Sequence, residues 1–172
     1  MHLNFIPLLS FCLFISVSVR CQDASTPKPA TYAIFTEVGG PGMQLSLNFD
    51  TRIQGREDGW GIRLGLGTNL GSNPNFFSLP VGVNYLAGED GNYFEIGGGV
   101  TYVHIGSSTD NAGYHIGSKD FYGPAQLFFG NVVLGYRRQP ADGGFHFRAG
   151  FAPSFGMNMF SMFPYIGVGC SF

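Results

Sequence analysis

Apolar and polar residues alternate with a period of two through long parts of this 172-residue chain. In residues 43–50 every second residue is apolar, and a similar alternation with polar residues or glycine recurs at 60–67, 94–102 and 145–151. Because successive side chains of a β-strand point to opposite faces, this period predicts strands with one apolar and one polar face. No apolar run after residue 21 approaches the roughly 20 residues that a membrane-spanning helix needs. The pattern therefore predicts an all-β chain.

Eight strand-like segments follow the N-terminal region, at approximately 31–38, 43–53, 60–70, 76–87, 93–105, 126–138, 145–155 and 165–172. Charged residues make up 12% of the chain, about half the usual share of a soluble domain. So little charge suits a surface in hydrocarbon, where only a closed barrel satisfies the backbone hydrogen bonds of strands. We therefore predict an eight-stranded antiparallel up-and-down transmembrane β-barrel with both chain ends in the periplasm. The alternative is a soluble lipocalin-like barrel, whose apolar faces would line the interior.

Charged residues fall on the strand face opposite the apolar side chains. In a membrane barrel that face lines the interior, so we predict an interior charge network of Asp50, Arg52, Arg63, Glu95, Arg137, His146 and Arg148. Side chains fill the interior of an eight-stranded barrel, and buried charges there must pair or be hydrated. The main interpretation is a salt-bridge plug. The alternatives are a gated pore in which Glu95 exchanges partners between Arg63 and Arg148, and a ligand cavity beside the inward glycines at 61, 65, 67, 97 and 99.

The N-terminal region has the features of an export signal. Residues 8–19 are apolar but too few to span a bilayer, which is typical of the hydrophobic region of a secretory signal. We predict a signal peptide at 1–21, a disordered leader at 22–30 and a barrel domain at 31–172. The alternative to cleavage after Cys21 is lipid modification of Cys21, which Arg20 disfavours because that processing prefers a small preceding residue. After cleavage only Cys170 remains, so no intrachain disulfide can form.

Short turns and aromatic residues mark the predicted periplasmic end. The turns at 54–59, 88–92 and 139–144 each contain an acidic residue followed by glycine, which supplies the positive φ of tight hairpins. The predicted outer connections are 39–42, 71–75, 106–125 and 156–164, of which the last two are longer. Because aromatic rings favour the membrane interface, we predict an outward-facing periplasmic girdle of Trp60, Tyr85, Phe94, Tyr136 and Phe145, together with the terminal Phe172.

The last eight residues alternate and end on an aromatic residue, which resembles the C-terminal strand of bacterial outer-membrane barrels. The resemblance implies an assembly signal at Tyr165, Gly167, Cys170 and Phe172. The segments 37–42, 45–50, 79–86, 134–140 and 144–151 resemble themes of small, functionally uncharacterised eight-stranded outer-membrane barrels of Bacteroidetes, with the architecture of OmpA and OmpX. This resemblance implies that the chain is exported to the outer membrane as a monomer, where it contacts the lipid and the barrel assembly machinery. It implies no activity.

Residue patterns for catalysis or metal binding are weak. Candidates for a nucleophile and a base are His104 with Ser107, and His115 with Ser118 and Asp120. Neither set matches the His-x-Ser pattern of PagL-type deacylases. Metal binding by His104, Asp110, His115 and Asp120 has no recognised ligand spacing. A formal net charge of −2 without a basic patch argues against nucleic acid. We therefore predict no enzyme activity, no cofactor and no nucleic-acid partner.

The last predicted outer loop is unusually apolar, since it contains Met157, Met159, Phe160, Met162 and Phe163. Such a loop packs on the rim or in the outer leaflet, or provides a lateral entry for a hydrophobic small molecule. The predicted function is a structural or surface-interaction role in the outer membrane, with a charge-plugged interior. The alternative is OmpW-like binding or passage of a small hydrophobic molecule through the barrel. The sequence identifies no surface ligand.

Overall fold

The computed structural model of the chain describes residues 29–69, 75–106, 114–116, 119–121, 125–156 and 159–172. The predicted signal peptide, Cys21 and most of the predicted leader lie outside these ranges. Within them, no helix has the length and apolar character needed to span a membrane.

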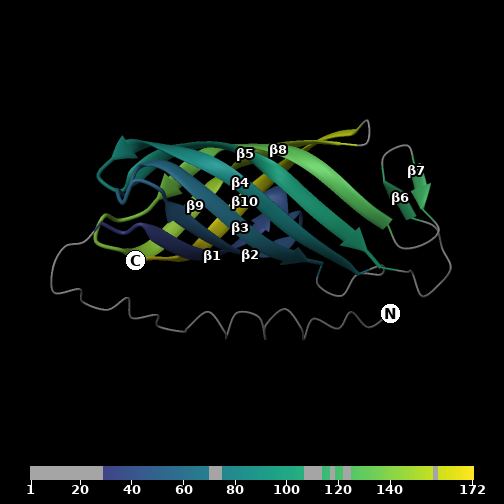
Figure 1. The fold of residues 1–172 in the computed structure, drawn as a ribbon, viewed down its shortest axis with the longest axis horizontal. Helices are drawn as coiled ribbons and strands as arrows, with labels where there is room; N and C mark the ends of the chain where they lie inside the picture. Colours follow the sequence, from purple (N-terminus) through teal and green to yellow (C-terminus); the bar gives the residue numbers. More distant parts are fainter. Residues whose placement is uncertain (1–28, 70–74, 107–113, 117–118, 122–124, 157–158) are drawn as a thin grey trace, which may run out of the picture.

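Eight antiparallel strands form a closed barrel (Figure 1). They are β1 (Tyr32–Gly39), β2 (Leu45–Arg52), β3 (Gly59–Thr68), β4 (Phe76–Glu89), β5 (Asn92–Ile105), β8 (Ala125–Arg138), β9 (Gly144–Gly156) and β10 (Met159–Ser171). Each strand pairs with the next barrel strand along the chain, and β10 pairs with β1 to close the barrel. Two short strands, β6 (Tyr114–Ile116) and β7 (Lys119–Phe121), form a separate hairpin between β5 and β8. The predicted eight-stranded up-and-down barrel is confirmed.

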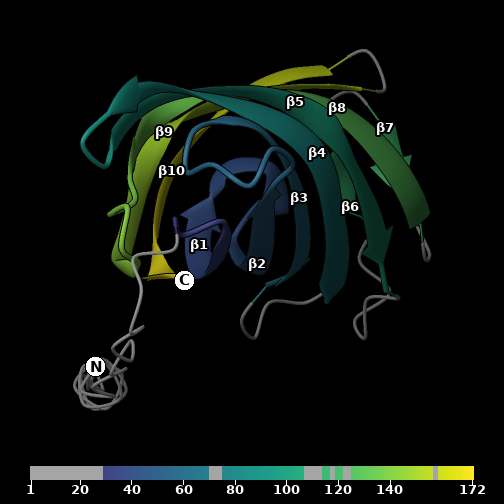
Figure 2. The same ribbon diagram turned by 60° about the vertical axis from the view of Figure 1, so that its left-hand side comes forward.

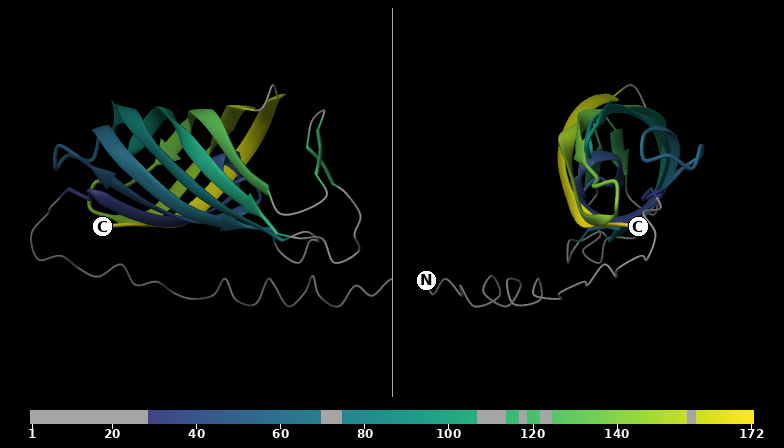
Figure 3. Two further views of the ribbon diagram at one scale, coloured as in Figure 1. Left: turned by 45° about the vertical axis from the view of Figure 1, so that its right-hand side comes forward. Right: turned by 90° about the vertical axis from the view of Figure 1, so that its left-hand side faces the viewer.

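Both described chain ends lie at one end of the barrel, beside the connections 53–58, 90–91 and 139–143 (Figure 3). We call this the hairpin end and the opposite one the loop end. Tyr32 and Phe172 exchange backbone hydrogen bonds of 3.0 and 2.9 Å, and the Ala30 amide donates to the Ala141 carbonyl at 2.8 Å. Ala30 is buried. Ala30, the last residue of the predicted leader, therefore packs against the barrel in this structure.

The last strand begins at Met159, whereas the sequence pattern predicted a start at Tyr165. The predicted outer loop 156–164 is therefore wrong, because most of it continues the β9–β10 hairpin. Pro164, the last residue of that predicted loop, lies within β10, although proline is uncommon inside a strand. Pairing of β10 with β1 ends at Tyr165, so Pro164 lies where β10 pairs with β9 alone, and proline is tolerated on such an edge.

The connection between β1 and β2 folds into the barrel (Figure 2). The prediction of an outer connection at 39–42 is wrong in this respect. Residues 40–42 form a short 3₁₀ turn, η2 (Gly40–Gly42), and all three are buried. The turn lies against seven barrel strands: β1, β3, β4, β5, β8, β9 and β10. We call residues 40–42 the lumen plug.

Local backbone geometry directs the plug inward. Gly39 and Gly40 have φ angles of 79° and 63°, which favour glycine. A Cβ atom at Gly40 would crowd the carboxylate of Glu37 and the side chain of Tyr165. The Ser78 hydroxyl donates to the Gly42 carbonyl at 3.0 Å, and the Thr101 hydroxyl donates to the Pro41 carbonyl at 2.9 Å. Hydroxyls on β4 and β5 therefore satisfy the carbonyl groups that the plug carries into the lumen.

Candidate functional site: the charged lumen

The barrel is apolar outside and charged inside. On β3, Trp60, Ile62, Leu64 and Leu66 are exposed, whereas Arg63 between them is buried. The same pattern holds around the barrel, where many large apolar side chains are exposed on the outer face. The soluble-barrel alternative required the apolar faces to line the interior. The structure instead has the inside-out arrangement expected of a barrel in lipid.

All seven residues of the predicted interior charge network are buried in the lumen: Asp50, Arg52, Arg63, Glu95, Arg137, His146 and Arg148. They come from β2, β3, β5, β8 and β9. Two groups of ion pairs form, one nearer the hairpin end around Asp50 and one nearer the plug around Arg148. The sequence pattern therefore assigned each side chain to the correct face.

Asp50 lies between two arginines. It forms an ion pair with Arg52, and its carboxylate accepts hydrogen bonds of 3.1 and 3.2 Å from Arg137. Asn84 donates to the Asp50 Oδ2 atom at 2.6 Å, and the Gln139 side-chain oxygen accepts from the Arg137 Nε atom at 3.0 Å. Such charge-assisted contacts offset the cost of removing these groups from water.

Arg148 lies between two carboxylates. Its Nη2 atom is 3.2 Å from Glu95, and its Nε atom is 3.4 Å from Glu37. Arg63 pairs with Glu37 at 2.5 Å and donates to Asn48. Glu95 also lies 3.9 Å from Arg137. The alternative that Glu95 exchanges between Arg63 and Arg148 is untested, but in this structure Arg63 pairs with a different acid.

Sequence reasoning missed Glu37 as a member of the network, although the side chain is 1% exposed and pairs with two arginines. It also missed the neutral partners Asn48, Asn84 and Gln139. The alternation within β1 contained the signal for Glu37. Ala33, Phe35 and Glu37 are buried, whereas Ile34, Thr36 and Val38 are exposed.

His146 has a packing role in this structure. Its ring stacks on Phe35 with centroids 4.9 Å apart, and neither ring nitrogen has a hydrogen-bond partner. The Arg148 guanidinium lies over the rings of Phe35 and Tyr165, at 5.0 and 4.6 Å. Aromatic rings therefore separate part of the charged lumen from the barrel wall and contribute cation–π attraction.

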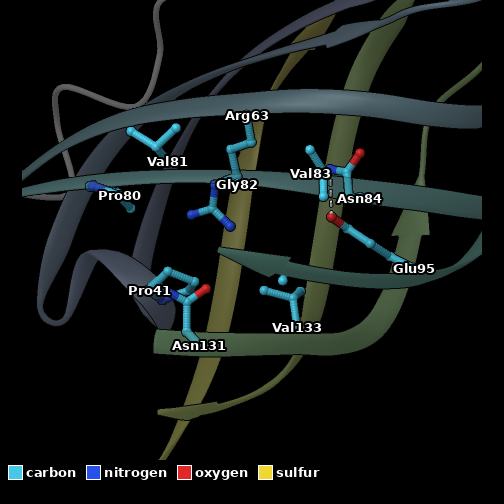
Figure 4. A pocket seen from close by; sticks show the side chains of 11 residues that line it. Pro41, Arg63, Pro80, Val81, Gly82, Val83, Asn84, Glu95, Asn131 and Val133 are labelled. Carbon is cyan, nitrogen blue, oxygen red and sulfur yellow. Dashed lines mark hydrogen bonds between the residues drawn. The ribbon is translucent and has the colours of Figure 1, made fainter. Parts of the chain in front are cut away.

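Two small cavities lie beside the lumen plug. One of about 20 Å³ lies beside Arg63, Asn84, Glu95 and the plug residue Pro41 (Figure 4). Another of about 10 Å³ lies on the plug beside Met43, Thr101 and Phe129. A water molecule needs roughly 10–15 Å³, so each cavity is the size of about one water.

At three of the five predicted inward glycines, neighbouring groups occupy the space beside the backbone. The Arg52 guanidinium occupies the space where Gly61 would carry a Cβ atom, and the Asn48 amide does so at Gly65. At Gly67 that space is taken by the Ser78 hydroxyl and the plug. The ligand-cavity alternative therefore finds no space beside these glycines.

The predicted girdle residues are exposed on the outer face near the hairpin end: Trp60, Tyr85, Phe94, Tyr136, Phe145 and Phe172. Trp60 and Tyr85 are register partners with ring centroids 5.3 Å apart, and Phe94 faces Tyr136 across β5 and β8. Tyr32, which was not predicted, stacks on Phe172 with centroids 6.0 Å apart. Their interfacial role stays a prediction.

The predicted assembly-signal residues divide between the two faces of β10. Tyr165 and Gly167 face the lumen and are buried, Cys170 is half-buried, and Phe172 is exposed. The alternation predicted for residues 165–172 therefore forms as expected. Recognition by the assembly machinery is not tested by this arrangement.

The structure does not bring the catalytic candidates together in the described ranges. His104 is on β5, with Phe77 and Gln126 as register partners, whereas Ser107, Asp110 and Ser118 lie outside those ranges. His115 and Asp120 are register partners in the β6–β7 hairpin. No group of three His, Cys, Asp or Glu residues in the described part of the chain is placed to hold a metal ion.

Of the apolar residues predicted for the last outer loop, Phe160 and Met162 are exposed on the outer face of β10, and Phe163 is half-buried. Phe163 borders the small cavity at the plug. Met157 lies outside the described residues, and Met159 begins β10. Residues 159–163 therefore belong to β10 and extend the barrel wall. They do not form the loop on which the lateral-entry interpretation depends.

Comparisons with known proteins identify the fold but no family. No protein-family model and no curated protein matches the chain. The N-terminal β-barrel domain of Pseudomonas aeruginosa OprF is similar in structure, with a TM-score of 0.58 and 14% identity over 84% of this chain and 98% of that chain. The chain has the fold of that barrel domain. Ail, the attachment invasion locus protein of Yersinia pestis, was also found, with a TM-score of 0.43 and 13% identity over 84% of this chain and 97% of that chain.

Proposed function

We propose that this chain is an outer-membrane β-barrel protein with a structural or surface-interaction role. The observation that carries the proposal is the apolar outer face around a buried, charged and plugged lumen. The similarity to OprF supports the same architecture, and the resemblance to small Bacteroidetes barrels supports export by a cleaved signal peptide. In this proposal the protein is a monomer, surrounded by outer-membrane lipid, and the assembly machinery recognises its terminal strand.

The closed lumen argues against the alternative function, passage of a small hydrophobic molecule through the barrel. With the plug in place, the two cavities beside it are of about 20 and 10 Å³, and a larger cavity of about 430 Å³ lies at the hairpin end beside Arg56, Glu57 and Glu89. A drug-sized ligand needs roughly 300–1,000 Å³. We therefore favour the structural or surface role.

Membrane insertion predicts a strong penalty for charge on the outer face. Leu64 is 51% exposed near the middle of β3. Leu64→Lys is therefore expected to lower the free energy of unfolding of the barrel in lipid vesicles by about 2–4 kcal/mol. Ile53 is 60% exposed in the hairpin-end connection, and Ile53→Lys is expected to cost only about 0–1 kcal/mol. Urea titration of both variants measures the difference. Equal costs would contradict a lipid-facing position of Leu64.

Cell fractionation tests the proposed location directly. The full chain with its own N-terminal region is expected to occur in outer membranes and to migrate differently in gels before and after boiling, because a closed barrel resists detergent until heated. Sequencing of the mature N-terminus is expected to give Gln22. A product in the soluble periplasmic fraction, without a heat-dependent shift, would exclude the proposed function.

A further inference from the structure

We propose that the barrel is a gated pore for small hydrated anions and that the lumen plug, residues 40–42, is its gate. This activity goes beyond the structural role proposed above. The proposal rests on three observations: the plug lies between two lumen cavities, its side-chain hydrogen bonds are neutral, and the lumen around it is charged.

The plug occupies the space through which a path along the barrel would run. Pro41 lines both the cavity of about 20 Å³ beside Arg63 and the cavity of about 10 Å³ beside Met43. In Figure 4 the Arg63 guanidinium extends into the region between the β4 residues and the plug residue Pro41. Withdrawal of Pro41 would therefore join two cavities that the plug now separates.

The side-chain hydrogen bonds to the plug are neutral. The carbonyl groups of Pro41 and Gly42 accept from the hydroxyls of Thr101 and Ser78, at 2.9 and 3.0 Å. A neutral hydrogen bond contributes little net stability, because water replaces it when it breaks. The ion pairs Arg63–Glu37, Arg137–Asp50 and Arg148–Glu95 join different barrel strands, whereas residues 40–42 carry no charged side chain.

Backbone strain at the end of the plug favours its release. Met43 has φ 75° and ψ −73°, an unfavourable region for a residue with a side chain. Such a conformation persists only while its surroundings hold it in place. The plug therefore ends in a strained residue, and its packing in the lumen together with two hydroxyl groups holds it in place.

The lumen beside the plug has the chemistry of a hydrated path. Several buried polar atoms there have no hydrogen-bond partner, including Glu37 Oε2, Arg63 Nη1, Glu95 Oε2 and Arg148 Nη1. Buried polar groups require partners, and water supplies them where protein does not. The described lumen holds four buried arginines against three buried acids, Glu37, Asp50 and Glu95. Arginine in excess favours anions over cations.

The first test releases the plug without altering the ion pairs. We expect Ser78→Ala/Thr101→Val, inserted into planar lipid bilayers in KCl solution, to be open about tenfold more of the time than the wild type, since two neutral hydrogen bonds are lost. Thr36→Val removes a hydroxyl that bonds the Val168 carbonyl at 3.3 Å on the outer face, and is expected to leave the open fraction unchanged. A heat-dependent gel shift establishes that each variant is folded.

A second variant and a salt gradient complete the test. Deletion of residues 40–42, with Gly39 joined to Met43, is expected to leave a permanently open pore whose reversal potential in a KCl gradient shows preference for chloride. Absence of conductance in both folded variants would overturn the proposal, because the ion pairs would then close the lumen. A preference for potassium would overturn the assignment to anions. Neither result would affect the proposed outer-membrane location, which fractionation tests separately.

Discussion

Replacement of Asp50 by asparagine is expected to lower the free energy of unfolding by about 3–5 kcal/mol. Asp50 is fully buried, and its carboxylate is paired with both Arg52 and Arg137. Asparagine keeps the size of the side chain but leaves both arginines without this anion. Since arginine stays protonated in proteins, the two guanidinium groups cannot escape by neutralising. Urea titration of the barrel in lipid vesicles measures the loss.

Asp142→Asn is the matched control. Asp142 is exposed in the hairpin-end connection 139–143, so the same chemical change is expected to alter stability by less than about 0.5 kcal/mol. A similar loss in both variants would show that general negative charge, and not the buried ion pairs, stabilises the barrel. A folded Asp50→Asn barrel of wild-type stability would contradict the charge network as a structural element.

Arg148→Met is expected to cost about 3–5 kcal/mol as well, for the opposite reason. The fully buried guanidinium lies between Glu37 and Glu95, and its removal leaves two buried carboxylates short of a cation. Methionine retains much of the apolar stem that packs near Phe35 and Tyr165. Arg138→Met, at the exposed neighbour of Arg137, is the control and is expected to cost little.

A double-mutant cycle separates the charge effect from lost packing. Glu95→Gln in the Arg148→Met background is expected to recover part of the loss, with a coupling energy of about 1–3 kcal/mol. Recovery follows because the second change removes a carboxylate that Arg148 contacts at 3.2 Å. Additive losses from the two substitutions would show that Arg148 stabilises the barrel mainly by packing.

The ion pairs and the lumen plug are expected to affect different properties of the barrel, namely its stability and its conductance. The ion pairs around Asp50 and Arg148 connect strands across the lumen, so breaking them is expected to lower the free energy of unfolding of the barrel. The plug is held by packing and by two neutral hydrogen bonds, and it ends in a strained residue, so its release is expected to leave the barrel folded. Stability measurements and conductance measurements therefore report on separate parts of the lumen.

Two features of the loop end were not predicted from sequence. The predicted outer loop ended at Pro164, but β10 includes this residue, and β1 has already ended opposite Tyr165. The segment 39–42 suggested a short outer turn, yet its glycines turn the chain into the lumen. The local residue pattern is compatible with either a loop or a strand at 159–164, and with either an outward or an inward turn at 39–42. The deciding contacts come from residues far away in the chain, such as Ser78 and Thr101.

The alternation of residues along the chain predicted the eight strands, the face of each side chain and the closed barrel. Side chains alternate between the two faces of every strand, so the residue pattern alone assigns Leu64 to the outside and Arg63 to the lumen. The residue pattern did not predict which charges pair or that Glu37 joins them. It also did not predict that residues 40–42 lie in the lumen. These features depend on strand register and on the direction in which a connection folds. Both are set by contacts across the barrel, which a periodic pattern along one strand does not encode.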